Sequence, residues 1–152
     1  MGMRQVQLGA ALALLGLAAC SKPFNYDSAS ESERQAFFES ATQGIYDGLD
    51  QSIPHGKGGV YMQMGKRNID VAHRRIEIQV DVQNGEDNEE DMPDFSGLTS
   101  AKMLRGVCPD YLAGDLARND VTVYIRFALP GGGTAAAVSA TPGACASYGK
   151  RS

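Results

Sequence analysis

The chain has few of the residues on which most enzyme and metal chemistry depends. Its 152 residues include only two histidines, His55 and His73, and three cysteines. Neither histidine lies near a nucleophile motif, no glycine-rich phosphate loop opens a helix, and no cysteine belongs to a Cys-x-x-Cys pair. These absences argue against catalysis and against a metal centre. We expect a protein that is not an enzyme and needs no cofactor.

The sequence also lacks a basic surplus and a second long apolar segment. It carries 14 basic and 18 acidic residues, and this formal net charge of −4 argues against nucleic-acid binding. Its one apolar run lies before residue 20 and is shorter than the ~20 residues that a transmembrane helix needs. We therefore expect no later part of the chain to span a membrane.

The apolar run has the organisation of a secretory signal. Arg4 is the only charged residue before Cys20, and a stretch rich in leucine and alanine closes on Leu17-Ala18-Ala19-Cys20. This ending resembles the cleavage site of bacterial lipoprotein signal peptides. The resemblance implies cleavage before Cys20 and stable anchoring through several acyl chains on that residue. Ser21, where a lipoprotein kept in the inner membrane would carry Asp, favours the periplasmic face of the outer membrane. The alternative is an ordinary signal peptide that leaves Cys20 free.

The two remaining cysteines, Cys108 and Cys145, form an even pair once Cys20 is assigned to lipid. Because the periplasm is oxidising, we predict a disulfide between them. The alternative is two buried free thiols. Closing the loop between them would stabilise the domain by about 4 kcal/mol in the chain-entropy account of disulfides.

Length and composition predict a single domain behind the anchor. Residues 1–19 are expected to be the signal peptide, and 20–29 the lipidated cysteine with a flexible tether. The range 30–146 is expected to form one periplasmic domain, and 147–152 a loose tail.

The first half of the domain predicts a helix and two strands. Ser30 followed by Glu33 is a capping-box signature, and Pro54 marks the end of the helix. Period-two alternation over 60–64 and 76–82 predicts strands, with a turn at 65–68 and a bulge near 72–75 between them. The apolar stripe of the helix comprises Phe37, Phe38, Ala41, Ile45 and Leu49.

The second half predicts helices and then two more strands. Apolar residues recur at helical spacing from 98 to 108, and Pro109 is expected to open a further turn of helix. The alternation over 121–129 predicts the clearest strand, and three glycines at 131–133 turn the chain into a weaker strand over 135–141.

Together these elements predict an α+β fold. We expect a small antiparallel sheet of about four strands with helices packed on one face, in the order helix, two strands, helices, two strands. The disulfide would join the last strand to the second helical layer. The sequence leaves the order of the strands within the sheet open.

Two charged segments have competing interpretations. The stretch 85–94 holds six carboxylates, and its composition is typical of a solvated loop. The alternative is a calcium site, although the spacing does not match the EF-hand pattern. The basic residues Lys66, Arg67, Arg74 and Arg75 could meet an acidic partner or lipid headgroups, although a solvated hairpin is the more common reason for such a run.

Several predicted features of this chain together resemble a known family. They are the lipidated cysteine, the first helix, the segment Val60–Val82, the Cys108 helix, the strand Asp120–Leu129 and the terminal Cys145. They resemble the α/β, disulfide-bonded pilotins of type II secretion. The resemblance implies a lipoprotein that captures the C-terminal segment of a secretin subunit as a helix in a groove, for delivery to the outer membrane.

Such a groove needs adaptable apolar side chains between helix and sheet. The candidates for partner binding are Phe38, Met62, Met64 and Met103, and the alternative is that they simply fill the core. Two other functions stay open. One is an inhibitor or immunity lipoprotein that acts on a periplasmic enzyme through the loop 86–94, and the other is a structural envelope lipoprotein.

Overall fold

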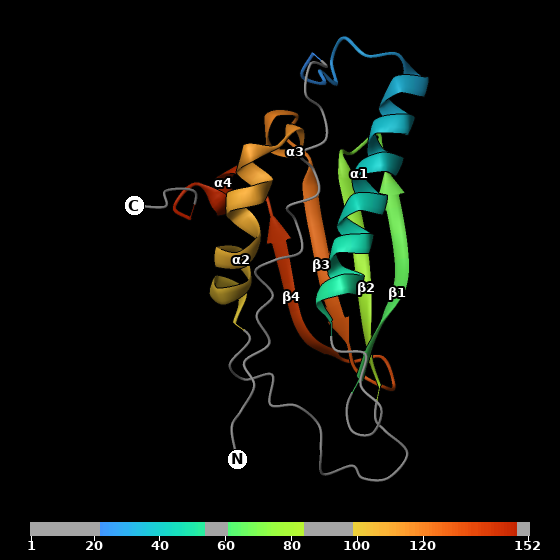
Figure 1. Cartoon of the computed structure of the whole chain (residues 1–152), viewed down its shortest axis with the longest axis vertical. Coiled ribbons are helices and arrows are strands. Elements are labelled where there is room, and N and C mark those ends of the chain that lie inside the picture. The colour runs from blue at the N-terminus through green and yellow to red at the C-terminus, as the bar shows by residue number, and fades with distance from the viewer. Residues whose placement is uncertain (1–21, 54–60, 84–98, 149–152) are drawn as a thin grey trace.

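The computed structural model describes residues 22–53, 61–83 and 99–148, which form a layer of helices on a four-stranded sheet (Figure 1). The acidic stretch 85–94, His55, the signal peptide and Cys20 lie outside the described residues. The elements in chain order are α1 (Glu31–Ser52), β1 (Tyr61–Asp70), β2 (Arg75–Gln83), α2 (Ser100–Ala113), α3 (Asp115–Arg118), β3 (Thr122–Ala128), β4 (Thr134–Ala140) and α4 (Pro142–Cys145).

The first helix begins at the residue that the capping signature predicts. The Ser30 hydroxyl accepts a hydrogen bond from the Glu33 N–H, and the Glu33 carboxylate accepts one from the Ser30 N–H at 2.7 Å. The second interaction is the main cause that lowers the pKa of Glu33 below its usual range, with the Ser30 hydroxyl next. Four of the five predicted stripe residues are buried, and Phe37 is half-buried.

Ser30→Ala should lower the free energy of unfolding at pH 7 by about 1 kcal/mol, because the Glu33 N–H loses its acceptor. Since the pKa of Glu33 is lowered in the folded state, the contribution of its carboxylate is present above the unfolded-state pKa and disappears as the pH falls through the folded-state pKa. Urea unfolding at neutral and acidic pH measures both effects. The control is Ser40→Ala, an exposed serine inside the same helix. Equal free energies of unfolding for the Ser30 and Ser40 variants would contradict a stabilising role of the Ser30 hydroxyl.

The strands follow their chain order within the sheet, β1-β2-β3-β4. The α+β class, the four strands and the element order are confirmed. The sheet is mixed, however, because β2 and β3 are parallel, with Ile78 opposite Ile125, while the β1–β2 and β3–β4 pairs are antiparallel. The physical reason is the connection through α2 and α3. A long helical crossover returns the chain to the starting end of the sheet, so the next strand runs in the same direction.

The first hairpin turns later than the sequence suggests. β1 runs unbroken from Tyr61 to Asp70, with a register shift between Met64 and Arg67, and the chain reverses at 71–74. The predicted turn is thus a bulge within β1, and the predicted bulge is the turn. Gly65 lies within this bulge, where a Cβ would come within 2.6 Å of the Asp81 carboxylate on the neighbouring strand.

Pro109 does not begin a new helix but lies inside α2. The proline removes one backbone hydrogen bond, and residues on either side of it hold the helix to the domain. Cys108 and Tyr111 are both buried, at 0% and 1% exposure. Gly114 follows the last residue of α2 as its C-cap, and α3 then forms one further short turn with Leu116 buried.

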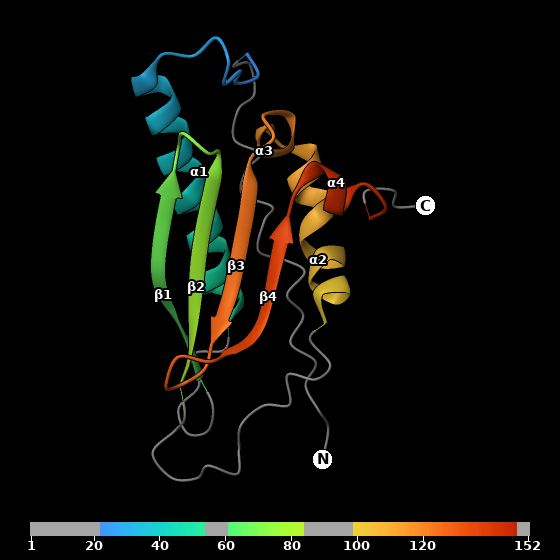
Figure 2. The ribbon, with the colours of Figure 1, turned by 180° about the vertical axis from the view of Figure 1, so that it is seen from behind.

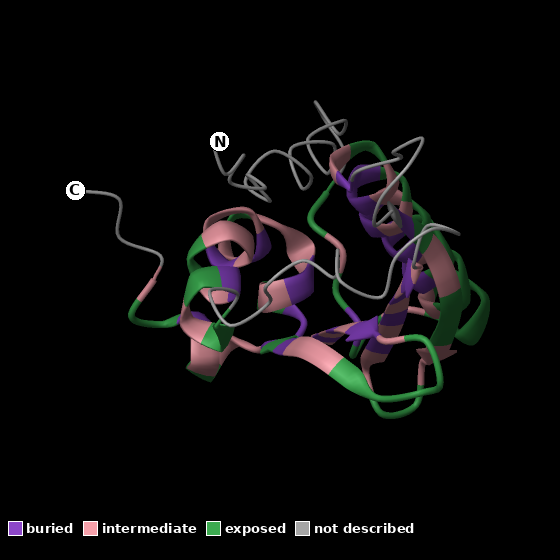
Figure 3. Ribbon diagram, turned by 90° about the horizontal axis from the view of Figure 1, so that it is seen from below, coloured by how far each residue is buried: buried purple, intermediate pink, exposed green. Residues whose placement is uncertain are grey.

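The two faces of the sheet differ in character. The side chains of β2 alternate between buried and half-buried along the whole strand. α1 packs against β1 and β2 while α2 packs against β4, both on the same face (Figure 3). No helix covers the opposite face in the described part of the chain (Figure 2). That face carries polar pairs, including Arg75 with Glu77 at 2.5 Å and Gln79 with Asp81 at 2.6 Å.

Candidate functional site

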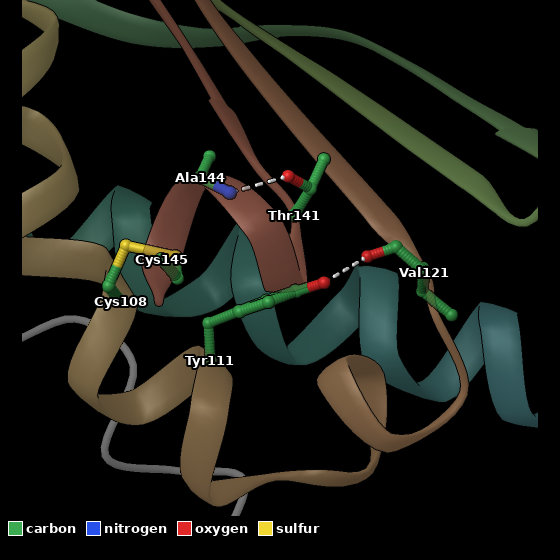
Figure 4. Close-up of a disulfide and its surroundings, with 6 residues drawn as sticks. All are labelled: Cys108, Tyr111, Val121, Thr141, Ala144 and Cys145. Carbon is green, nitrogen blue, oxygen red and sulfur yellow. Dashed lines mark hydrogen bonds between the residues drawn. A yellow bond between two sulfur atoms is a disulfide. The ribbon is translucent and has the colours of Figure 1, made fainter. Parts of the chain in front are cut away.

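The disulfide between Cys108 and Cys145 is confirmed. Its sulfur atoms lie 2.06 Å apart, both residues are fully buried, and the bond joins α2 to α4 just beyond β4 (Figure 4). The short helix α4, which the sequence analysis did not predict, places Cys145. The Thr141 hydroxyl caps it by accepting a hydrogen bond from the Ala144 N–H at 3.0 Å. The Pro142 that follows the cap is typical of a first helical position.

Tyr111 lies beside the disulfide and ties α2 to the start of β3. Its hydroxyl donates a 2.7 Å hydrogen bond to the carbonyl of Val121, and both residues are buried (Figure 4). Burial, with a smaller contribution from the Asp120 charge, raises the pKa of Tyr111 well above its usual range. The phenol is therefore neutral at physiological pH and acts as a donor that fixes structure.

The segment expected to be a flexible tether is attached to the domain from Phe24 onward. Tyr26 is only 8% exposed, and its N–H donates a 2.8 Å hydrogen bond to the side chain of Asn119. Its hydroxyl donates to the carbonyl of Val71 at 2.8 Å, and Asn119 also donates to the carbonyl of Phe24 at 3.0 Å. Residues 24–27 of the segment 20–29, which the sequence analysis expected to be a tether, are therefore docked against the domain.

Two guanidinium groups hold the ring of Tyr26. Those of Arg34 and Arg74 lie 4.4 and 4.0 Å from its centroid, within the range of cation–π attraction. Arg34 also donates to the Tyr26 carbonyl at 2.8 Å, and Arg74 pairs with Asp27 at 2.5 Å. The contacts of Phe24, Tyr26 and Asp27, made to α1, to the β1–β2 turn and to the α3–β3 junction, are called here the N-terminal clamp.

Stacking adds an apolar contact to the N-terminal clamp. The rings of Phe24 and Phe37 are stacked with centroids 4.0 Å apart, and Phe37 in turn meets Phe38 edge to face at 5.6 Å. A sequence signal for this docking exists, because a free tether has little use for two aromatic residues within three positions. The partner Asn119 carries no such signal, since only the fold brings it next to residue 26.

The four predicted partner-binding residues lie on the helix-bearing face but do not form one exposed cluster. Phe38 on α1, Met62 on β1 and Met103 on α2 are buried, at 0%, 6% and 5% exposure. Met64 is partly buried and lies opposite Val80. Three of the four are thus part of the hydrophobic core in this structure.

A more accessible apolar pair lies on α2. Successive residues of an α-helix are turned by 100°, so Val107 points between the directions of the buried Met103 and Tyr111, and Leu104 points between those of the buried Tyr111 and Cys108. The side of α2 from Met103 round to Cys108 is called here its inward arc. Both nevertheless remain only partly buried. The inward arc of α2 is therefore incompletely covered at these two positions, which the sequence analysis did not distinguish from the core.

The predicted basic cluster is distributed over different surroundings. Arg74 belongs to the N-terminal clamp, Arg75 pairs with Glu77 and lies over Tyr124, and Arg67 donates to Gln43 on α1 at 2.7 Å. Lys66 is exposed at the bulge. These side chains do not form a single basic surface.

His73 has a local structural role in the β1–β2 turn. Its N–H donates to the Asp70 carboxylate at 3.0 Å, and its ring nitrogen Nδ1 lies 2.7 Å from the other carboxylate oxygen. The backbone hydrogen bond is the larger cause that lowers the pKa of Asp70, and the ring contact is next. With its side chain 80% exposed, His73 stabilises the turn at the surface.

Within the part of the chain that the structure describes, no three His, Cys, Asp or Glu side chains are grouped so as to hold a metal ion. None of the helices in the described ranges is long and apolar enough to cross a membrane. The chain matches no protein-family model, no curated protein sequence and no solved structure. Fold and site define a disulfide-bonded α+β domain with a docked N-terminal segment and a partly open apolar arc on α2.

Proposed function

We propose that the chain is a lipoprotein anchored through Cys20 at the periplasmic face of the outer membrane, with a non-catalytic domain that binds a helical segment of a partner protein. In the most specific form of the proposal, the partner segment is the C-terminal part of a secretin subunit and the protein acts as a pilotin. The observation that carries the binding role is the incomplete burial of Leu104 and Val107 on the inward arc of α2.

An amphipathic helix binds by inserting apolar residues at helical spacing against such positions. Leu104 and Val107 are three residues apart and so lie on neighbouring turns of one helix face. The buried Met103 beside them can adjust its shape, because its unbranched side chain adapts to different neighbours. We therefore assign contact with the partner to Leu104 and Val107, and a supporting role beneath them to Met103.

The test is a pulldown from detergent-solubilised envelopes with the mature domain in which Cys20 is replaced by serine. We expect a secretin to be recovered, and recovery to be lost when its C-terminal segment is deleted. Leu104→Ser should weaken capture about tenfold, the loss that corresponds to one covered leucine side chain. Leu112→Ser is the matched control, because Leu112 is equally a partly buried leucine of α2 but points outside the inward arc.

The other outcomes separate the alternatives. Recovery of a periplasmic hydrolase in place of a secretin would favour an inhibitor or immunity lipoprotein. Recovery of peptidoglycan-associated proteins alone would favour a structural role. Equal capture by the Leu104 and Leu112 variants would contradict the assignment of the binding surface.

A further inference from the structure

The N-terminal clamp attaches residues 24–27 to one end of the sheet. Its partners are the β1–β2 turn, through Val71 and Arg74, and the α3–β3 junction, through Asn119. These two places lie side by side, since the Thr122 N–H donates a 2.8 Å hydrogen bond to the Arg74 carbonyl. Both are at the upper end of the molecule in Figure 1, whereas the β3–β4 turn lies at the lower end.

The length of chain between Cys20 and this end is short. Four residue steps separate Cys20 from Phe24, and a fully extended chain covers at most ~3.6 Å per residue, or about 14 Å in total. The opposite end of the sheet is farther away by the length of β2, whose nine residues span about 30 Å at ~3.3 Å each. An anchor at Cys20 therefore keeps the clamped end of the sheet within about 14 Å of the lipid surface, whereas this short link does not hold the opposite end there.

The attachment is made by groups that resist displacement. Tyr26 is buried, its backbone N–H, carbonyl and hydroxyl all form hydrogen bonds, and two guanidinium groups lie over its ring. Undocking would expose the ring of Tyr26 to water and break the two hydrogen bonds that the side chain of Asn119 forms with the backbone of Phe24 and Tyr26. The clamp thus prevents the domain from swinging about residues 24–27.

We infer that the protein holds its domain end-on to the lipid surface in which Cys20 is anchored. The β1–β2 turn and the α3–β3 junction lie next to the lipid headgroups, and the β3–β4 turn faces away. The inference rests on the lipidation of Cys20 proposed above. It has a consequence for binding, because α2 begins at its lower end in Figure 1, the end farther from the lipid, so the first turns of this helix, which include Leu104, lie toward the aqueous side.

The test uses the full-length lipidated protein in vesicles of phosphatidylethanolamine and phosphatidylglycerol that contain a lipid with a nitroxide quencher on its headgroup. A fluorophore is attached in one preparation through Ala72→Cys, in the β1–β2 turn, and in another through Pro130→Cys, at the start of the β3–β4 turn. Both positions are exposed, and neither contributes a side chain to the clamp. We expect several-fold stronger quenching at position 72 than at position 130.

A second variant separates the clamp from simple proximity. A flexible insert of about 20 glycine and serine residues between Ser21 and Lys22 has an end-to-end distance of roughly 25 Å and leaves every described contact intact. It should abolish most of the quenching at position 72 while the protein stays in the membrane. Unchanged quenching with the insert would overturn the inference, as would equal quenching at both positions or stronger quenching at position 130.

The failure of the anchor is distinguishable from the failure of the orientation. The mass of the intact protein reports whether Cys20 carries lipid. An unlipidated protein that stays in solution would overturn the proposed anchoring, and the inference with it. A lipidated protein that fails the quenching test would overturn the orientation alone.

Discussion

Replacing Cys108 and Cys145 with alanine should lower the free energy of unfolding by about 4 kcal/mol, the value that the chain-entropy account gives for a loop of this size. The sequence separation of the two residues is 37, so the disulfide restricts a long part of the unfolded chain. The bond also fixes α4 to α2, and with it the end of β4. Because folded domains are typically stable by only 5–15 kcal/mol, this loss is a large share of the total.

Urea unfolding of the oxidised protein and of the double variant measures this effect. Reduction of the wild-type protein after unfolding, followed by refolding in reductant, should give the same loss without any substitution. Cys108→Ala alone is a useful comparison, because it leaves one free thiol but opens the same loop. Equal midpoints and equal slopes for the oxidised and reduced proteins would contradict a stabilising role of the disulfide.

Phe38→Ala should destabilise the domain by about 3–5 kcal/mol, the cost of truncating a buried aromatic side chain. Phe38 is 0% exposed and lies edge to face with both Tyr26, at 6.2 Å, and Phe37. The substitution leaves a cavity between α1 and the N-terminal clamp. This prediction decides between the two interpretations of Phe38, because a side chain that serves mainly to contact a partner would contribute little to the stability of the free domain.

The matched control is Phe37→Ala, the same substitution one position earlier on the same helix. Phe37 is only partly buried, so its loss should cost clearly less than the loss of Phe38. Thermal or urea unfolding of both variants, with the disulfide intact, gives the comparison. A small effect at Phe38 together with a loss of partner capture would return this residue to the binding surface.

Local signals predicted much of this fold. The Ser30 and Glu33 cap fixes the start of α1 through two hydrogen bonds that involve only neighbouring residues. The alternation of β2 and β3 follows from one face being buried, a requirement that each strand meets on its own. The prediction that Cys108 pairs with Cys145 used only the count of the remaining cysteines and the expectation of an oxidising compartment.

Positions where a local signal competes with contacts to distant residues were predicted less well. Gly65 and the polar residues after it resemble a turn, yet β2 pairs with β1 on both sides of them, and the sheet takes them up as a bulge. Pro109 resembles the start of a helix, yet burial on both sides of it keeps α2 continuous. In both cases contacts with distant residues outweigh a local preference worth a few kcal/mol at most.

By itself, the sequence determined the α+β class, the order of the main helices and strands, the disulfide and the apolar faces of β2 and β3, because these depend on local pattern and on residue counts. Only the tertiary structure decided the parallel β2–β3 pair, the burial of Phe38, Met62 and Met103, and the docking of Tyr26 against Asn119, 93 positions away. The reason is physical. A residue's solvent exposure and its distant partners are set by how the layers pack, and that packing is not encoded within any short segment of the chain.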